Sequence, residues 1–159
     1  MIIGSGNIAK ALNDREGAVF FASGVSNSRC TDVTEFIREI DLMDGLVTDK
    51  CVFYFSTISK YYTESAYTLH KGFMEMLCKI KFKNYNIIRI GNIDFDTNPN
   101  TFVNALRAKK AKGEPYELFD EYRYMISKEE LLLLTDNLPL TGKNEINVFG
   151  RMVKPKDLI

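Results

Sequence analysis

The sequence alternates short, almost wholly apolar segments with amphipathic segments, and this alternation limits the fold more than any other feature. Three segments have the length and composition of buried strands: AVFFAS (18–23), CVFYFST (51–57) and NIIRIG (86–91). Segments with apolar residues at helical spacing lie between them, at 31–43 and 62–83. Strands that are apolar throughout and alternate with helices are typical of a parallel sheet covered on both faces. The sequence therefore predicts a three-layer α/β domain with a mainly parallel sheet.

The same patterns place the remaining elements. We expect a single domain over 1–159, with strands near 1–3, 18–23, 51–56, 86–90 and 146–149. Further helices are predicted at 100–113 and 128–135, and a short strand near 116–119. Thr31 or Asp32 is suited to cap the helix at 31–43.

Composition narrows the class of function. Lys plus Arg equals Asp plus Glu, 21 each, whereas a dedicated nucleic-acid binder normally has a basic excess. No apolar run approaches the roughly 18 residues of a membrane span, and the N-terminus lacks the pattern of a signal peptide. The cysteines Cys30, Cys51 and Cys78 form no CxxC motif, and with one histidine there is no metal constellation. We therefore expect a cytoplasmic protein with buried free thiols, no metal, no nucleic-acid partner and no membrane contact.

The N-terminal segment carries a glycine turn between a short strand and a helix. Residues 4–9 read GSGNIA and fit the G-x-G-x-x-G/A pattern of dinucleotide-binding proteins. In that pattern Gly4 permits a tight turn, Gly6 lets a phosphate approach the backbone, and Ala9 packs on the sheet. The turn, Gly4, Ser5, Gly6, Asn7 and Ile8, is thus a candidate cofactor site, and an ordinary glycine turn is the alternative. The pattern makes the expected fold a reduced Rossmann-like domain.

The adenosine half of a dinucleotide has no evident counterpart. The fingerprint expects an acidic residue about 20 positions on, at the end of the second strand, to hold the adenosine ribose. Gly24, Val25 and Ser26 occupy that region, and Asp14 and Glu16 come too early. Only a few residues separate the first helix from AVFFAS, so no further strand–helix unit fits between them.

The segment YTLHK places Tyr67 and Lys71 four residues apart near the start of the predicted helix at 62–83. At 100° per residue they project together from nearly the opposite side to an apolar stripe of Leu69, Phe73, Met76, Leu77 and Ile80. An exposed surface pair is one interpretation. The other is proton transfer, because a lysine charge lowers a tyrosine pKa toward neutral pH, and Thr57 or Ser56 at the preceding strand end would hold a substrate oxygen.

These motifs, in this order, resemble the short-chain dehydrogenase/reductase superfamily, above all its extended branch of NAD-dependent epimerases and dehydratases that act on nucleotide sugars. GSGNIA resembles the phosphate loop, VFFASG the strand whose end (Ala22, Ser23 and Gly24) lies against the cofactor, and YTLHK the Y-x-x-x-K motif. VFYFST is similar to the strand that ends in the catalytic hydroxyl, which implies Thr57, with Ser56 as the alternative.

Two further positions follow from the resemblance, as do two departures. IIRIGN resembles an R-x-x-N segment, which makes Asn92 a substrate contact, and Arg123 falls where an arginine often lies near the nucleotide phosphates. Members of this branch are commonly considerably longer. The 4,6-dehydratases have an Asp-Glu pair after the catalytic threonine, where this chain has Ile58 and Ser59. This departure disfavours dehydration of the sugar, so the reactions expected from the resemblance are epimerisation and ketone reduction.

The resemblance implies an NAD(P)-dependent epimerase or reductase in which Tyr67 is the acid/base, Lys71 lowers its pKa and Thr57 orients a nucleotide sugar. A non-catalytic binding or assembly protein derived from the same fold is the alternative, because the adenosine-binding unit is missing. The resemblance also implies a homodimer through the helices at 31–43 and 62–83, with Phe36, Ile40 and Met43 as contacts. A monomer remains the alternative.

Overall fold

The centre of the molecule is a five-stranded parallel sheet. The computed structural model describes residues 1–95, 97–99, 101–117 and 121–159. The strands lie in the order β1-β2-β3-β4-β7, and each neighbouring pair is parallel. Their bounds are Ile2–Ile3 for β1, Ala18–Phe21 for β2, Cys51–Thr57 for β3, Tyr85–Ile90 for β4 and Lys143–Val148 for β7. The prediction of an α/β, mainly parallel sheet is confirmed.

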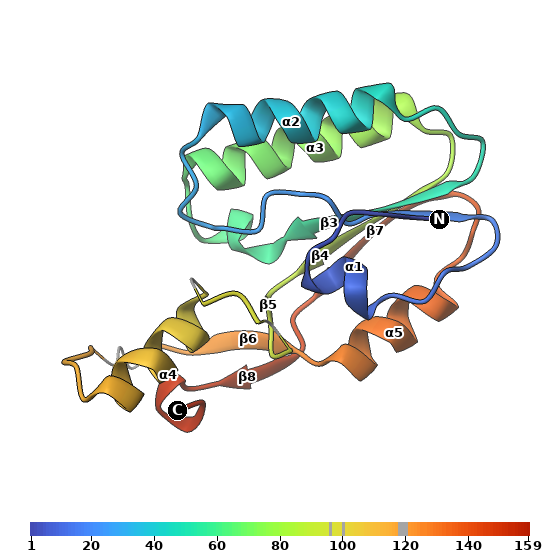
Figure 1. The fold of residues 1–159 in the computed structure, drawn as a ribbon. Helices are drawn as coiled ribbons and strands as arrows, with labels where there is room; N and C mark the ends of the chain where they lie inside the picture. Colours follow the sequence, from blue (N-terminus) through green and yellow to red (C-terminus); the bar gives the residue numbers. More distant parts are fainter. Residues whose placement is uncertain (96, 100, 118–120) are drawn as a thin grey trace.

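Helices cover both faces of this sheet (Figure 1). The helices α2 (Val33–Gly45) and α3 (Ala66–Lys81) lie over one face, and α1 (Asn7–Ala11) and α5 (Lys128–Asn137) over the other. Successive side chains of a strand point to opposite faces. In β3, Val52 and Tyr54 therefore pack with α2 and α3, while Phe53 and Phe55 pack with α1 and α5. Both faces of the sheet are buried at β2, β3 and β4, which is why these strands are mostly apolar, whereas the edge strand β7 alternates exposed and partly buried residues.

Polar side chains fix where the helices begin. The Asp32 side chain accepts a hydrogen bond from the Thr34 backbone N–H at the start of α2, so Asp32 rather than Thr31 is the cap. Ser65 forms a capping box with Thr68 at the start of α3. The expected helix at 62–83 thus begins at Ala66, since Ile58–Tyr61 form a separate 3₁₀ helix. Among the described residues no helix has the length and apolar character to cross a membrane.

A second, smaller sheet follows β4 and was not predicted. It contains β5 (Asn92–Ile93), β6 (Arg123–Ile126) and β8 (Arg151–Val153), in the order β5-β6-β8. The helix α4 (Phe102–Lys112) lies beside it, and a 3₁₀ turn at Pro155–Asp157 follows β8. The strand expected near 116–119 is wrong for 116 and 117, while 118 and 119 lie outside the described residues. The strand forms at 123–126 instead, because pairing with β5 and β8 fixes it there.

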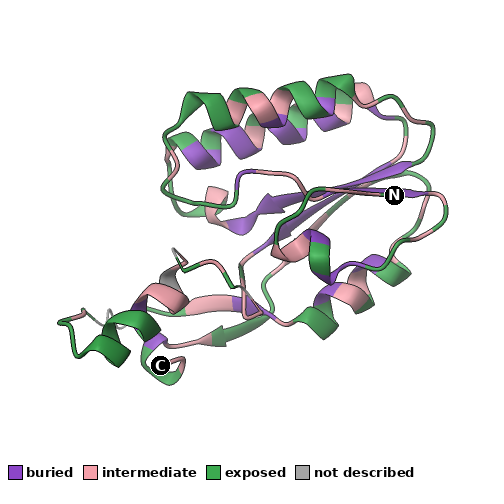
Figure 2. Ribbon diagram, in the orientation of Figure 1, coloured by how far each residue is buried: buried purple, intermediate pink, exposed green. Residues whose placement is uncertain are grey.

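The helix α3 lies on the sheet by the face that carries its polar residues. Its buried residues are Tyr67, Thr68, His70, Lys71, Met74, Glu75 and Cys78. The apolar stripe points outward instead: Leu69 is 63%, Phe73 44%, Met76 49% and Ile80 76% exposed. Figure 2 shows this division between the inner and outer sides of the two upper helices. The interpretation of Tyr67 and Lys71 as an exposed surface pair is therefore wrong.

Candidate functional site

The site lies at the carboxyl end of β3, where two adjacent hydroxyls have different surroundings. Ser56 Oγ donates to Glu75 Oε1 at 2.6 Å. Glu75 also accepts two hydrogen bonds from Arg89, at 2.9 and 2.6 Å, and both side chains are buried. Burial raises the pKa of the Glu75 carboxyl, but hydrogen bonds from Arg89, Lys60 and Ser56 lower it more. Ser56 therefore belongs to a buried ionic network that joins β3, β4 and α3.

Thr57, the next residue, caps the 3₁₀ helix at Ile58–Tyr61 that precedes α3. Its Oγ1 accepts a hydrogen bond from the Ser59 backbone N–H at 3.1 Å and lies 2.8 Å from Ser59 Oγ. The Thr57 side chain also lies near enough to the Tyr67 phenol to lower its pKa. The structure thus brings Thr57 and Tyr67 together as expected. Of the two hydroxyls at the end of β3, Thr57 lies beside Tyr67, whereas Ser56 is bonded to Glu75.

Lys71 lies one helical turn after Tyr67, with its ammonium turned to a different partner. Its Nζ lies 3.1 Å from Glu39 Oε1 and 3.3 Å from the Tyr54 hydroxyl, and 5.9 Å from the centroid of the Tyr67 ring. Lys71 is buried with 3% of its surface exposed, and Glu39 is fully buried. A buried ammonium needs a counter-charge, and Glu39 of α2 supplies it.

Because Glu39 forms an ion pair with Lys71 and neutralises its charge, one expectation from the sequence is wrong. Lys71 was expected to lower the pKa of Tyr67. Instead, burial of the phenol and the negative charge of Glu39 raise that pKa, and the Thr57 side chain opposes the rise only in part. The pKa of Lys71 is itself lowered by burial, against the opposing charge of Glu39. In this state Tyr67 is a neutral phenol that has a proton to donate.

The end of β2 lies against this ion pair. A Cβ atom on Gly24 would lie 2.5 Å from Lys71 Nζ and 2.8 Å from Glu39 Oε1. The Val25 backbone N–H donates to Glu39 Oε2 at 2.8 Å. The segment of Ala22, Ser23 and Gly24, a candidate cofactor contact, is therefore adjacent to Lys71.

The glycine turn adjoins the same segment. Gly4 has a φ of +129°, and a Cβ there would meet the Ala22 carbonyl oxygen at 2.4 Å, so both its conformation and its packing need glycine. A Cβ on Gly6 would meet nothing within 4 Å, which leaves its backbone open to a ligand. Asn7, at the start of α1, accepts a hydrogen bond from Thr97 Oγ1 at 2.8 Å. These surroundings fit the phosphate and nicotinamide side of a dinucleotide.

The described part of the chain offers no similar fit for the adenosine side. The chain passes from α1 to β2 through residues 12–17, and among the described residues β1 pairs with β2 and with no other strand. Within that link, Arg15 donates to the carbonyls of Thr135 and Leu138 at the end of α5. Asp14 pairs with the N-terminal amino group of Met1. The side chains of Asp14 and Arg15 are thus already bonded to other groups of the chain.

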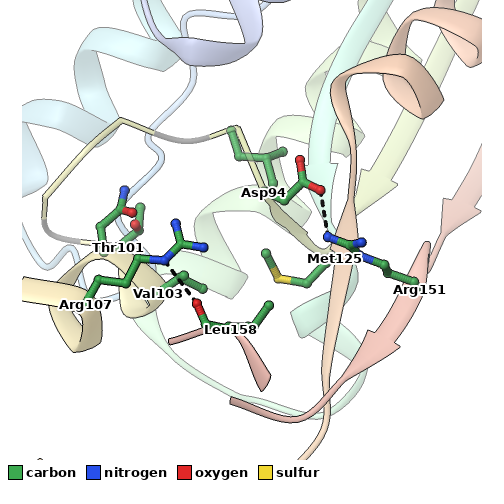
Figure 3. A pocket seen from close by; sticks show the side chains of 9 residues that line it. Asp94, Thr101, Val103, Arg107, Met125, Arg151 and Leu158 are labelled. Carbon is green, nitrogen blue, oxygen red and sulfur yellow. Dashed lines mark hydrogen bonds and ion pairs between the residues drawn. The ribbon is translucent and has the colours of Figure 1, made fainter. Parts of the chain in front are cut away.

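The two expected substrate contacts lie in the second sheet. Asn92 Nδ2 donates to the Tyr124 carbonyl at 3.3 Å, and Arg123 NH1 donates to Glu121 at 3.0 Å. A cavity of about 40 Å³ lies between this sheet and α4 (Figure 3). Arg107 and Arg151 line it, with Arg151 paired to Asp94 at 2.9 Å and Arg107 donating to the Leu158 carbonyl at 3.0 Å. Two guanidinium groups beside one small cavity are suited to an anion.

Sequence reasoning missed Glu39 and His70, although one signal was present. In the predicted helix at 31–43, Glu39 falls on the same side as Phe36, Ile40 and Met43, so it is a charged residue inside an apolar stripe. Such a residue needs a buried partner of opposite charge. The sequence did not say which lysine would supply it.

The fold agrees with that of NAD-dependent nucleotide-sugar epimerases. The NAD complex of the enzyme WbmG from Bordetella bronchiseptica matches with a TM-score of 0.67 and 14% identity, over 89% of this chain and 53% of that one. A UDP-glucuronic acid 4-epimerase from Bacillus cereus, in complex with NAD and a fluorinated UDP-sugar, gives 0.66 and 18%, over 95% and 59%. A UDP-glucose 4-epimerase from Thermotoga maritima with UDP-glucose gives 0.64 and 16%, over 89% and 58%.

This chain therefore spans little more than half the length of these structures. At such identities the likeness establishes the fold, which is the shortened epimerase-type fold that the sequence motifs indicated. No protein-family model matches the sequence, and no curated protein matches it either.

Proposed function

We propose that this chain is an NAD(P)-dependent epimerase or reductase that acts on a nucleotide sugar or a related hydroxyl or keto compound. The observation that carries the proposal is the meeting of Thr57, Tyr67 and Lys71 at the carboxyl end of β3, beside Gly24. Ligands of parallel α/β sheets bind at the carboxyl ends of the strands. A phenol, a hydroxyl and an ammonium at that edge make a unit for proton transfer next to a hydride carrier.

The chain's own residues would divide the work as follows. Thr57 would hold the substrate oxygen beside the Tyr67 hydroxyl, whose pKa the Thr57 side chain already lowers. Tyr67, a neutral phenol, would donate its proton to a carbonyl oxygen as that oxygen gains electrons, and would take the proton back in the opposite direction. A bound nicotinamide would supply or accept the hydride. Burial of Tyr67, which is 8% exposed, keeps bulk water from the proton.

The glycine turn and the end of β2 would hold the cofactor, NAD or NADP. Gly4, Ser5, Gly6, Asn7 and Ile8 would contact its phosphates, and Ala22, Ser23 and Gly24 its nicotinamide half, together with Tyr67 and Lys71. The open surroundings of Gly6 and the direct contact of Gly24 with the ion pair support this placement. Several structures with this fold contain NAD, and one contains NADPH.

The substrate's nucleotide would lie along the second sheet. The cavity lined by Arg107 and Arg151 supports an anionic group there, and Asn92 lies on the strand between this cavity and β4. We assign Arg123 to the same side of the ligand. Some structures with this fold contain UDP or UDP-sugars.

The outward side of α2 and α3 supports a homodimer. Val33 and Ile37 of α2 are 63% and 49% exposed, and Leu69, Phe73, Met76 and Ile80 of α3 continue this apolar surface. We propose that two copies bury it against each other about a twofold axis. Phe36 and Ile40, which are partly buried, remain contacts in this proposal. Met43 does not, because it is fully buried under its own chain.

A second candidate is a nucleotide-binding protein without catalysis. It is favoured by the Glu39–Lys71 pair, because a lysine whose charge is balanced by a buried carboxylate gives Tyr67 little help in losing its proton. We propose a cytoplasmic location for either function. The three free cysteines are compatible with a reducing compartment.

Calorimetric titration with NADH and NADPH tests the cofactor assignment. We expect saturable binding of at least one of them, with an affinity at least about tenfold weaker in Lys71→Met, because Lys71 lies at the nicotinamide side. Lys10→Met, on the exposed side of α1, is the matched control and should change the affinity little. Absence of saturable binding of both cofactors by the folded wild-type protein would exclude the NAD(P)-dependent enzyme and leave the second candidate.

A further inference from the structure

The carboxylate of Glu39 accepts hydrogen bonds from four groups, which belong to three separate parts of the chain. Its Oε1 accepts from the Tyr54 hydroxyl of β3 at 2.8 Å and from Lys71 Nζ of α3 at 3.1 Å. Its Oε2 accepts from the Val25 backbone N–H at 2.8 Å and from His70 Nε2 at 2.9 Å. A carboxylate offers about four acceptor positions, so Glu39 has its capacity filled. One fully buried side chain thus connects β3, α3 and the segment after β2.

The network holds Glu39 in its charged form. Burial alone would raise the pKa of this carboxyl, but the hydrogen bond from His70 and the charge of Lys71 lower it to about 2. His70 is itself fixed, since its ring stacks on Phe36 with the centroids 4.4 Å apart. The ammonium of Lys71 therefore meets a permanent negative charge in a fixed place, and its own position is set by that charge.

The geometry gives no space between this pair and the candidate cofactor segment. The Gly24 backbone packs directly on both charged groups, because even a methyl group there would overlap Lys71 Nζ and Glu39 Oε1. The neighbouring Val25 N–H is held by the same carboxylate. A displacement of Glu39 would therefore move the segment and Lys71 together.

We infer that Glu39 is a positioning residue, which fixes the Lys71 ammonium beside Gly24 and thereby presents it to the nicotinamide side of the bound cofactor. This inference rests on the proposed function. Glu39 acts through Lys71 and does not itself touch the cofactor, because its carboxylate is fully buried and its acceptor positions are filled by groups of the chain. The sequence motifs assigned no role to Glu39, and its partner Lys71 lies 32 positions further along the chain.

A double-mutant cycle on cofactor affinity separates positioning from general support of the fold. Glu39→Gln removes the charge at nearly constant size, and should weaken NADH binding about tenfold in the wild-type background. In the Lys71→Met background the same change should alter NADH affinity less than about twofold, because the residue it positions is gone. An equal loss in both backgrounds would overturn the inference. Asp41→Asn, an exposed position of α2, is the control.

A second variant, Glu39→Asp, and a second measurement, the acetylation rate of Lys71, keep the inference testable if Glu39→Gln does not fold or no cofactor binds. Glu39→Asp keeps the charge and withdraws it by one methylene, so it serves if Glu39→Gln does not fold, and should weaken NADH binding about threefold. Acetylation of Lys71 by acetic anhydride, followed by mass spectrometry, needs no cofactor. Loss of the Glu39 charge should raise its rate about tenfold at an unchanged circular dichroism spectrum. If wild-type protein binds neither NADH nor NADPH, the proposed function fails, and an unchanged acetylation rate would separately overturn the positioning of Lys71 by Glu39.

Discussion

The substitution Phe73→Glu should separate the proposed homodimer into monomers while leaving each chain folded. Phe73 lies in the middle of the outward apolar stripe of α3 and is 44% exposed in the single chain. A dimer through this face would bury what remains exposed. A charge at the same position has no partner of opposite sign among the stripe residues Leu69, Met76 and Ile80.

The size of the effect follows from the exposed fraction. Complete burial of a phenylalanine side chain stabilises by about 1.5–3 kcal/mol, so the 44% that is exposed corresponds to about 1 kcal/mol. A twofold axis places the residue in the interface twice, which gives about 2 kcal/mol. Since each 1.4 kcal/mol is a factor of ten, the dissociation constant should rise about 30-fold. Burial of two carboxylates adds to this, so the figure is a lower bound.

Sedimentation equilibrium over a range of protein concentrations measures the dissociation constant directly. Leu133→Glu is the matched control, because Leu133 is 69% exposed on α5, on the opposite face of the sheet. We expect the control to dimerise as the wild type does, with equal melting temperatures for both variants at low concentration. A monomeric wild type at micromolar concentration, or a Phe73→Glu dimer as tight as the wild type, would refute the reasoning.

Three further outcomes follow from the buried groups. Gly24→Ala should lower the free energy of unfolding by about 1–3 kcal/mol in urea melts, because its Cβ would lie 2.5 Å from Lys71 Nζ; unchanged stability would mean that the pair has room to move. Glu39 has a folded pKa of about 2 against an ordinary 4.5, so its stabilisation is present above pH 4.5 and is lost as the pH falls toward 2. Wild type should thus lose about 3 kcal/mol more than Glu39→Gln over that range, and parallel acid profiles would contradict the charged state of Glu39. Ser56→Ala should cost about 1–2 kcal/mol of stability through Glu75 with no change in NADH affinity, whereas a large loss of affinity would return Ser56 to the site.

The central sheet could be predicted because its strands are buried on both faces. AVFF and CVFYF are apolar at successive positions. Such a strand buries side chains on both of its faces, which requires helices on both sides of the sheet. The second sheet could not be predicted in the same way. Its strand β5 has two residues, and β6 pairs with segments about 30 positions before and after it. Pairing between distant segments, rather than local pattern, makes those strands.

The orientation of α3 shows a different limit. An apolar stripe normally faces the core, yet here Leu69 and Ile80 face outward and Lys71 and Glu75 face the sheet. The buried charges are acceptable only because Glu39 and Arg89, from other elements, neutralise them. The motif therefore identified Tyr67, Lys71 and Thr57 as a group, but the partner of the lysine, and with it the direction of the Tyr67 pKa, required the folded chain.

Hydride transfer tests the central claim most directly. Wild-type protein at high concentration is mixed with NAD or NADP and a panel of nucleotide sugars, and absorbance at 340 nm is followed in parallel with Tyr67→Phe. The account predicts reduction of the cofactor by at least one nucleotide sugar, at a rate about 100-fold or more lower in Tyr67→Phe when both proteins are saturated with cofactor. Equal rates in the two proteins, or tight cofactor binding without any transfer across the panel, would contradict it.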